Sequence, residues 1–402
     1  MNEWNTYRVK DVAKFISEKA NDCSLPYIAL DNIVSWDGYY IPSDSTSDGN
    51  SNVCKKGDVL FGKLRPYLAK GYIPTQDSIC SPEFIVLRPN DLINNSFLLY
   101  YLLSSSFVSY IKDQVAGVKM PRTNALQIGR VSFALPPIEE QELIVSYLDK
   151  ECDKITREIN LLERKVDCYS RLRRSLINRI VTQGLNQMAP LKLSGLPWIE
   201  FIPEHWNIKR GKSILKEVYR NVRPEDGIVT CFRDGEVTLR VNRRTTGFTE
   251  SEKEIGYHGV RVGDLVVHQM DAFAGAIGIS DSDGKCSPIC IVCRPLNEDE
   301  TDIRYYCQLL RVMAYSGFIQ SLAKGIRERT TDFRYKTLEI LHLPVPPYVE
   351  QQQIVTYLDE KCSRIDSIIE KIKLKIERLK ELKRSLINEV VTGQRTIKTS
   401  DL

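Results

Sequence analysis

The chain has 402 residues, of which 42% are hydrophobic, so it is too long for one ordinary domain and apolar enough to form two or three cores. This composition excludes a disordered chain, and a net charge of only +4 means that a nucleic-acid partner would have to be held by local basic patches. No run approaches 18 apolar residues, the start lacks a signal peptide, and the eleven cysteines follow no disulfide framework. We therefore expect a cytoplasmic protein with reduced thiols and no membrane contact.

The first segment, residues 1–137, is predicted to be a globular α+β or mainly β module. Short β-branched runs alternate with Gly, Pro and Asp, and one helix is expected near Phe97. Within it, GDVLFGKL at Gly57 has the skeleton of a phosphate-binding loop. However, Leu64 stands where that loop needs Ser or Thr, and Pro66 interrupts the helix that would face the phosphate. The pattern therefore favours a strand over a nucleotide site.

Residues 138–184 are predicted to form one long helix. Apolar residues recur in alternating steps of three and four from Val145 to Ile180, which is typical of a coiled coil. Some 45 residues at about 1.5 Å each would make a helix of roughly 65 Å.

The segment 185–346 is predicted to contain a linker and a second globular module. The linker is rich in Gly and Pro, so we expect an extended surface segment, and one helix is expected near Ile303. A second coiled-coil helix over residues 347–393 and a tail over 394–402 complete the chain.

The two halves are copies of one unit. A shift of 210 positions aligns residues 136–182 with residues 346–392 without a gap, with 21 identities in 47 positions. The modules match more loosely at an offset of 206, as in CSPEFIVLRP at Cys80 and CSPICIVCRP at Cys286. Both helices break their apolar seam at the same place, with Arg173 in one and Lys383 in the other. Such a cation fixes register, reaches a partner, or extends past the edge of the seam into water.

Three cysteines of the second module have a C-x3-C-x2-C spacing that resembles an iron-sulfur signature: Cys286, Cys290 and Cys293. In the first module the corresponding residues are Cys80, Phe84 and Leu87, so two of the three positions accept purely apolar side chains. This substitution predicts thiols packed in a core and no metal site. The histidines show no ligand spacing.

The tripeptide Pro-Pro-Tyr at Pro346 resembles the base-gripping loop of amino-methyltransferases. That loop needs Asn, Asp or Ser directly before the prolines to accept hydrogen bonds, and Val345 cannot accept one. The sister copy reads LPPI. We therefore predict no catalytic residue here, a junction between a strand and the long helix, and a packing role for Tyr348.

These combined motifs resemble one family. A module ending in LPP-x-x-EQ or VPP-x-x-EQ, a long helix ending in RSLIN-x-x-VT and a linker such as SGLPWIEFIPEHW are similar to the DNA-specificity subunit of type I restriction-modification enzymes. One departure is that the first module keeps only Glu3, Trp4 and Asn5 of the lead-in that spans Ile202 to Trp206.

The resemblance implies an α+β fold with two tandem α/β target-recognition domains, each followed by a long helix, and with the two helices in an antiparallel coiled coil. Each domain would read half of a bipartite, asymmetric target in double-stranded DNA, and the helices would set the spacer. It implies two docked methyltransferase subunits, to which two restriction subunits can be added. The chain itself would bind no cofactor, and S-adenosylmethionine, ATP and Mg would belong to the partner subunits.

Reading a base edge requires Arg, Lys, Asn, Gln or Asp side chains on a domain that phosphate contacts hold in register. In the first module the candidate DNA-binding residues are Lys63, Arg65, Tyr67, Lys70, Lys119 and Arg122. In the second module they are Arg240, Arg243, Arg244, Gln269, Asp271, Arg327, Arg329 and Arg334.

Two alternatives belong to other classes of protein. An autonomous DNA methyltransferase would transfer methyl groups without a partner. A coiled-coil scaffold would show no salt-dependent preference for any duplex.

Overall fold

The computed structural model describes residues 4–20, 24–47, 49–115, 120–243, 255–322 and 332–401. They form two compact units, each assembled from separate stretches of the chain. Unit 1 combines residues 1–165 with 371–402, and unit 2 comprises residues 166–370. Each unit therefore contains one globular module and a part of each long helix. No helix in the described ranges is both long and apolar enough to cross a membrane.

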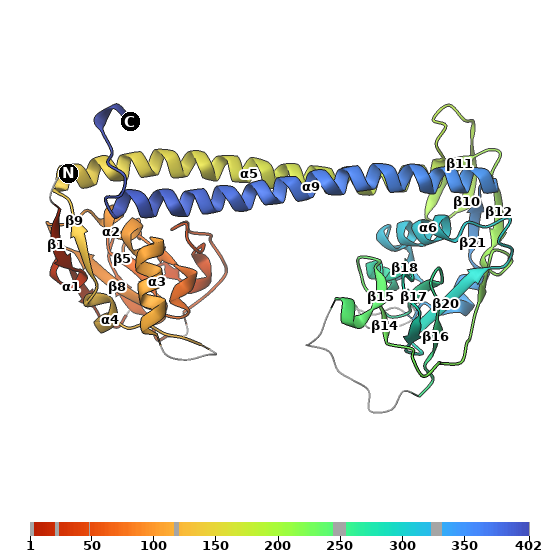
Figure 1. The fold of residues 1–402 in the computed structure, drawn as a ribbon, viewed down its shortest axis with the longest axis horizontal. Coiled ribbons are helices and arrows are strands. Elements are labelled where there is room, and N and C mark those ends of the chain that lie inside the picture. The colour runs from red at the N-terminus through yellow and green to blue at the C-terminus, as the bar shows by residue number, and fades with distance from the viewer. Residues whose placement is uncertain are drawn as a thin grey trace. The chain divides into compact units, whose positions relative to one another are not determined.

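Unit 1 is built on a four-stranded antiparallel sheet in the order β2-β8-β5-β6, beside a smaller sheet β3-β7-β4 and the pair β1-β9. Its strands are β1 (Asn5–Arg8), β2 (Ala13–Ile16), β3 (Tyr27–Ile28), β4 (Asn52–Cys54), β5 (Val59–Gly62), β6 (Gly71–Tyr72), β7 (Ser78–Cys80), β8 (Phe84–Pro89) and β9 (Ser132–Leu135). Its helices are α1 (Val9–Val12), α2 (Asn95–Leu102), α3 (Ser105–Gln114), α4 (Ala125–Gly129) and the start of α5 (Ile138–Gln183) (Figure 1).

Unit 2 repeats this plan, with a four-stranded sheet in the order β13-β20-β17-β18 and the pair β12-β21. Its strands are β10 (Leu191–Leu196), β11 (Ile199–Pro203), β12 (Asn207–Arg210), β13 (Leu215–Glu217), β14 (Val229–Cys231), β15 (Val237–Leu239), β16 (His258–Val260), β17 (Leu265–His268), β18 (Ile277–Ile279), β19 (Gly284–Cys286), β20 (Cys290–Pro295) and β21 (His342–Val345). Its helices are α6 (Ile303–Tyr315), α7 (Phe318–Ser321), α8 (Tyr335–Ile340) and the start of α9 (Tyr348–Val391).

The duplication seen in the sequence extends to individual contacts. In unit 1 the buried Asp58 carboxylate accepts two hydrogen bonds from Arg88, at 2.7 and 2.8 Å. In unit 2 the equivalent Asp264 accepts one from Arg294 at 2.6 Å. Both carboxylates also cap the turn before a central strand, β5 or β17. The two modules are thus copies in fold as well as in sequence.

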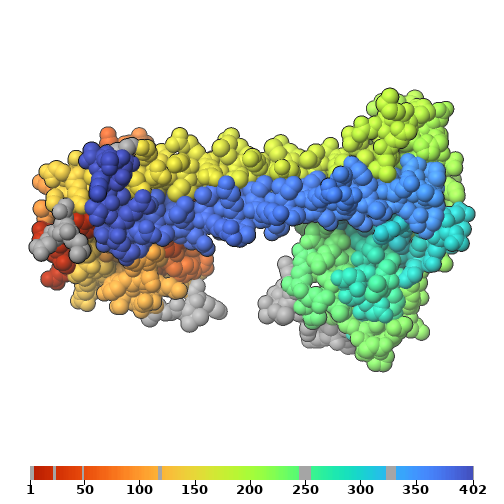
Figure 2. All heavy atoms as spheres, turned by 45° about the horizontal axis from the view of Figure 1, so that its top comes forward, coloured from red at the N-terminus to blue at the C-terminus, as the bar shows by residue number. Residues whose placement is uncertain are grey.

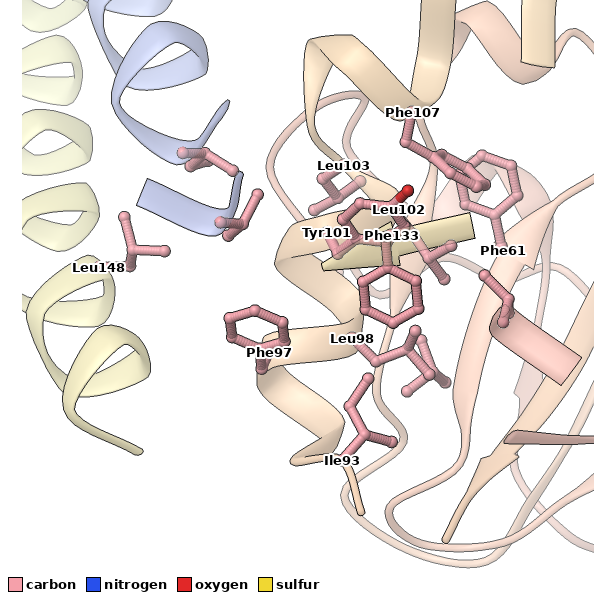
Figure 3. Packing of buried hydrophobic residues seen from close by; sticks show 14 of the residues in the cluster. Phe61, Ile93, Phe97, Leu98, Tyr101, Leu102, Leu103, Phe107, Phe133 and Leu148 are labelled. Atoms are coloured by element: carbon pink, nitrogen blue, oxygen red, sulfur yellow. The ribbon is translucent and has the colours of Figure 1, made fainter. Parts of the chain in front are cut away.

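Figure 3 shows how the core of unit 1 joins the sheet to the long helices. Phe97 of α2 points toward Leu148 of α5, while Leu98 and Leu102 of the same helix face the sheet side. Tyr101 stacks on Phe133 with ring centroids 4.3 Å apart. Because α2 is buried on both sides, it packs the module directly against the helical part of its unit.

Each helix expected in a module is in fact two helices. The segment near Phe97 breaks at Ser104, whose hydroxyl accepts a hydrogen bond from the Phe107 backbone amide and so caps α3. The segment near Ile303 breaks at Gly317, which has a left-handed φ of 80°. The expectation of single helices was wrong because Ser104 and Gly317 each cap a new helix within the segment.

The linker is also more ordered than an extended surface segment. Its residues pair as the antiparallel hairpin β10–β11, in which Ile199 and Ile202 are buried. The hairpin leads to Trp206, which is fully buried and donates its indole hydrogen to Glu350 of α9 at 3.0 Å. The lead-in peptide therefore attaches the second module to the first turn of α9.

Both long helices are unbroken (Figure 1). Within each unit, seam residues of the two helices belong to one buried cluster. In unit 1 Lys375 of α9 pairs with Glu158 of α5 at 2.7 Å, and Lys383 donates to Thr156 at 2.9 Å. The α9 residue with the higher number contacts the α5 residue with the lower number, so the two segments run in opposite directions there. In unit 2 Arg173 of α5 pairs with Asp366 of α9 at 3.0 Å.

Each long helix ends on a glycine against a tryptophan. Gly184 follows α5 with a φ of 75°, and a β-carbon there would lie 3.3 Å from the ring of Trp206. Gly393 follows α9 with a φ of 73°, and a β-carbon there would lie 3.3 Å from the ring of Trp4. Figure 2 shows the dark blue C-terminal segment lying over the start of α5, where Arg395 stacks 5.5 Å from Tyr147.

One buried glutamine closes the first turn of each long helix. Gln141 accepts from the amide of Asn94 at 2.8 Å and donates to the carbonyls of Leu92 and Pro136. Gln351 makes the same three contacts in unit 2, with Asp302 at 2.9 Å, Glu300 at 3.1 Å and Pro346 at 2.9 Å. These bonds join the helix start, the end of the strand before it and the loop that opens α2 or α6.

We predict that Gln351→Leu lowers the free energy of unfolding by about 2–4 kcal/mol, because it removes the hydrogen-bond partner of three backbone groups, two of them in buried bonds, without changing side-chain volume much. Gln353→Leu, at an exposed position of the same helix turn, is the matched control and should change it by less than about 0.5 kcal/mol. Urea unfolding followed by circular dichroism measures both. Equal stabilities for the two variants would show that the three hydrogen bonds of Gln351 do not stabilise the fold.

Candidate nucleic-acid interface

Four of the six candidate residues of the first module lie on the connection between β5 and β6, namely Lys63, Arg65, Tyr67 and Lys70. A short 3-10 turn, Pro66–Leu68, occupies this loop, and the residues on either side of it have left-handed backbones, with φ of 49° at Arg65 and 46° at Ala69. Residues with a β-carbon rarely adopt a left-handed backbone, and this conformation costs on the order of 1 kcal/mol per residue. Such strain persists only where the surrounding structure holds it, so the loop has a fixed shape.

The loop is held by the segment 120–123. The Arg65 amide donates to the Pro121 carbonyl at 2.8 Å, and the Thr123 amide donates to the Lys63 carbonyl at 2.9 Å. These bonds place Lys63, Arg65 and Arg122 on adjacent loop segments of one small surface. We call this surface, formed by residues 63–70 and 120–123, the first loop pair.

The side chains of the first loop pair differ in their freedom. Arg65 and Tyr67 are exposed, and Arg122 pairs with Glu83 at 3.0 Å while 58% of its side chain stays exposed. Lys70 is half-buried and donates to the Leu30 carbonyl at 2.9 Å, which turns its ammonium toward the body of the module. Lys119 lies outside the described residues. Arg65, Tyr67 and Arg122 are therefore the members best placed to meet a ligand.

The second module carries the equivalent surface, formed by residues 269–275 and 332–334, which we call the second loop pair. The Phe333 amide donates to the Gln269 carbonyl at 3.2 Å, as Thr123 does to Lys63 in the first module. Here Asp271 precedes the 3-10 turn and Gly275, with a φ of 91°, follows it. The position of Arg65 is thus taken by an acid, and the strained Ala69 is replaced by a glycine.

Ion pairs fill much of the second surface. Asp271 pairs with Arg233 at 2.8 Å and lies 3.3 Å from the His268 ring, whose pKa is lowered mainly by burial. Arg334 pairs with Asp332 at 2.7 Å. The second loop pair therefore presents carboxylate and guanidinium groups side by side.

Two further candidate residues of the second module, Arg240 and Arg243, lie at or just after the β14–β15 hairpin. Arg243 pairs with Asp234 at 2.5 Å and with Glu236 at 3.0 Å, and it stacks 4.2 Å from the Phe232 ring. Its guanidinium lowers the pKa of Asp234. Arg240 donates to the Thr230 hydroxyl at 3.4 Å. Arg244, Arg327 and Arg329 lie outside the described residues.

Two further residues at these surfaces, Arg233 and Met120, were not predicted from the sequence. Arg233 lies at the tip of the β14–β15 hairpin with 66% of its side chain exposed, and the Asp-Gly pair that follows it is a turn signal that marked this tip. Met120 is 64% exposed beside Pro121. An exposed methionine carries no sequence signal of its own.

The structure also shows the places of the three motifs that resemble a phosphate-binding loop, an iron-sulfur signature and a methyltransferase loop. Gly57 leads into the buried strand β5 and not into a helix, so no helix N-terminus faces a phosphate there. Cys290 and Cys293 lie on β20 with an odd spacing, and they pack into different cores, so they face opposite sides of the sheet. Val345 pairs with Asn207 in β21, and the two prolines lead into α9.

Part of the chain matches a known family, and several known proteins are similar to it. Residues 1–164 match the family described as type I restriction modification DNA specificity domain. The specificity subunit of type I restriction enzyme MjaVIII from Methanocaldococcus jannaschii is 21% identical over 423 residues, which cover 98% of this chain and 94% of that protein. The specificity subunit of EcoDI from Escherichia coli is 25% identical over 169 residues, or 40% of this chain and 38% of that protein.

Solved structures show the same fold. A chain from a structure of the complex assembly of a type I R-M system aligns with a TM-score of 0.73 at 17% identity, covering 98% of this chain and 99% of that one. The HsdS subunit from Thermoanaerobacter tengcongensis aligns with a TM-score of 0.52 at 18% identity, covering 98% of both chains.

We predict that Arg65→Asn leaves the free energy of unfolding within about 0.5 kcal/mol of the parent, because asparagine tolerates a left-handed backbone. Arg65→Val should lower it by about 1–2 kcal/mol, because a β-branched side chain clashes in that conformation. Both changes remove the same charge from an exposed position. Urea unfolding separates them, and equal stabilities would contradict the strained loop shape.

Proposed function

We propose a division of labour for this chain, which is a type I restriction-modification DNA specificity subunit: each globular module reads one half of a bipartite DNA target, and the long helices set the distance between the halves. The subunit has no catalytic role itself. It works with DNA and with the other subunits of its restriction-modification system.

The duplicated loop pairs carry this proposal. Two modules of one fold present surfaces at the same place with different chemistry, Arg65 in one and Asp271 in the other. Arginine suits the two acceptors of a guanine edge, whereas a carboxylate accepts from an amino group such as that of cytosine. Two unlike surfaces imply an asymmetric target. We include Lys63, Tyr67, Gln269 and the basic residues of 323–331 in the reading surface.

We propose further that the helices dock two methyltransferase subunits, which bind S-adenosylmethionine, and that two restriction subunits using ATP and Mg can join them. The helices would run as one antiparallel coiled coil between domains 1–137 and 185–346. The protein would act in the cytoplasm, where its DNA lies. An autonomous methyltransferase and a scaffold without DNA are less consistent with the family match and with the strand at Val345.

The central test reconstitutes the chain with its methyltransferase subunits and maps methylated adenines in modified DNA. We expect one bipartite, asymmetric motif with a fixed unread spacer. Methylation by the chain alone would support the autonomous enzyme. A complex that prefers no duplex at any salt concentration would support the scaffold.

We predict that Arg65→Asn weakens modification of the parent site by about 10-fold to 100-fold and relaxes the bases accepted in one half-site only, since one arginine–guanine contact is worth about 1–3 kcal/mol. Asp271→Asn should relax bases in the other half-site only. Methylation mapping of both variants reads this out. Relaxation of the same half-site by both changes would contradict separate reading by the two modules.

Lengthening both helices should lengthen the spacer. One heptad inserted after Lys165 and one before Lys371, where the two units meet in the sequence, adds about 10 Å, or about 3 base pairs at 3.4 Å each. We expect the methylated motif to keep both half-sites and to gain unread bases between them. A heptad in α5 alone breaks helix pairing and serves as the control. A change in the half-site bases would contradict the ruler.

A further inference from the structure

The position where the helix seam of α9 admits a cation is directly connected to the first module. Lys383 is buried, with 9% of its side chain exposed, and it forms an ion pair with Asp37 and donates to the Thr156 hydroxyl at 2.9 Å. Asp37 belongs to the first module, Thr156 to α5 and Lys383 to α9. One ammonium therefore joins three separate parts of unit 1.

A buried cation of this kind is sensitive to geometry. Removing a charge from water is costly unless partners stand at hydrogen-bond distance, so Lys383 is stable only when Asp37 and Thr156 are both in place. An apolar contact would tolerate sliding of the module along the helices, whereas this contact does not. The pair thus specifies one position of the module.

The neighbouring residue adds a second contact. Arg384 stacks on the ring of Trp36 at 4.7 Å from its centroid. Trp36 has a left-handed φ of 64°, which a tryptophan adopts only when its surroundings hold it there. Gly38, with a φ of 70°, packs on α2, where a β-carbon would lie 3.3 Å from Leu99. The turn 35–38 is thus fixed from two sides.

The same turn also reaches the first loop pair. The Trp36 amide donates to the Ala69 carbonyl at 2.9 Å. Ala69 is itself left-handed, fully buried, and lies at the end of the 3-10 turn that follows Arg65. Two of the strained residues are therefore hydrogen-bonded to each other, and the path from α9 to the loop consists of Lys383, Asp37, Trp36 and Ala69.

We propose that the turn 35–38 is a positioning element that sets where the first loop pair stands relative to α5 and α9, with Lys383 as its anchor. This inference rests on the proposed function and deepens it. Lys383 and Asp37 touch no base, so they act on spacing and not on base identity. In unit 2 the equivalent cation, Arg173, pairs with Asp366 of the other helix, so this anchor distinguishes the first module.

The test uses Lys383→Met, which keeps an unbranched stem and removes the charge, in the complex with the methyltransferase subunits. Substrates carry both half-sites separated by the parent spacer or by one base pair more or less. We expect the preference for the parent spacer over its neighbours to fall about tenfold, while the bases of both half-sites stay unchanged. Asp37→Asn should show the same loss, and Lys383→Arg, which can keep the ion pair, should retain most of the preference.

The matched control is Lys380→Met, a partly exposed lysine one turn earlier whose ion pair with Glu377 lies within α9. It should leave the spacer preference unchanged. If Lys383→Met lowers modification equally at every spacer, its role is only structural and the inference is overturned. An unchanged spacer preference in both Lys383→Met and Asp37→Asn overturns it as well. Failure of the parent complex to methylate any bipartite site would instead overturn the proposed function.

Discussion

The structure depends on a buried amide at the start of each long helix. Gln141 and Gln351 are fully inaccessible, and each bonds three backbone groups, two in the loop that opens α2 or α6 and one just after the strand that precedes the long helix. A buried side-chain amide can pay for its desolvation only when its partners are in register, so this contact fixes the direction in which the helix leaves its module. In each unit the helix seam and the module core belong to one buried cluster. The same device occurs twice because the whole unit is duplicated.

The duplicated features, above all the two long helices, could be predicted from the sequence. Features that depend on the contacts of single side chains could not. The self-match located both long helices, and their ends at Gln183 and Val391 lie within a few residues of the expected ones. The seam cations remained ambiguous, because a lysine at a heptad position gives no sign of Asp37, a residue 346 positions away. The hairpin β10–β11 was hidden by its Gly and Pro content, since the same residues serve tight turns and extended segments alike. The left-handed Arg65 and Ala69 could not be foreseen, because tertiary contacts impose that conformation.

The two modules combine one scaffold with two kinds of surface chemistry. The buried Asp–Arg pairs, Asp58 with Arg88 and Asp264 with Arg294, recur because they hold the central sheet, whatever the loops carry. The loops differ in charge, in backbone strain and in their ion pairs. Which candidate side chains meet a base stays a prediction, since loop surfaces of this kind are under no packing constraint that would reveal their use.

The glycine–tryptophan contacts have a topological consequence. Gly184 joins the end of α5 to the module that follows it, and Gly393 joins the end of α9 to the module that opens the chain. Each helix is thereby linked to two modules, one through its first turn and one through its last. Following these contacts from module to helix to module to helix leads back to the starting module, so the contacts do not depend on which element comes first in the chain. The order module–helix–module–helix and the order helix–module–helix–module would generate the same set of contacts, so the arrangement is specified by the links and not by the point at which the chain is opened.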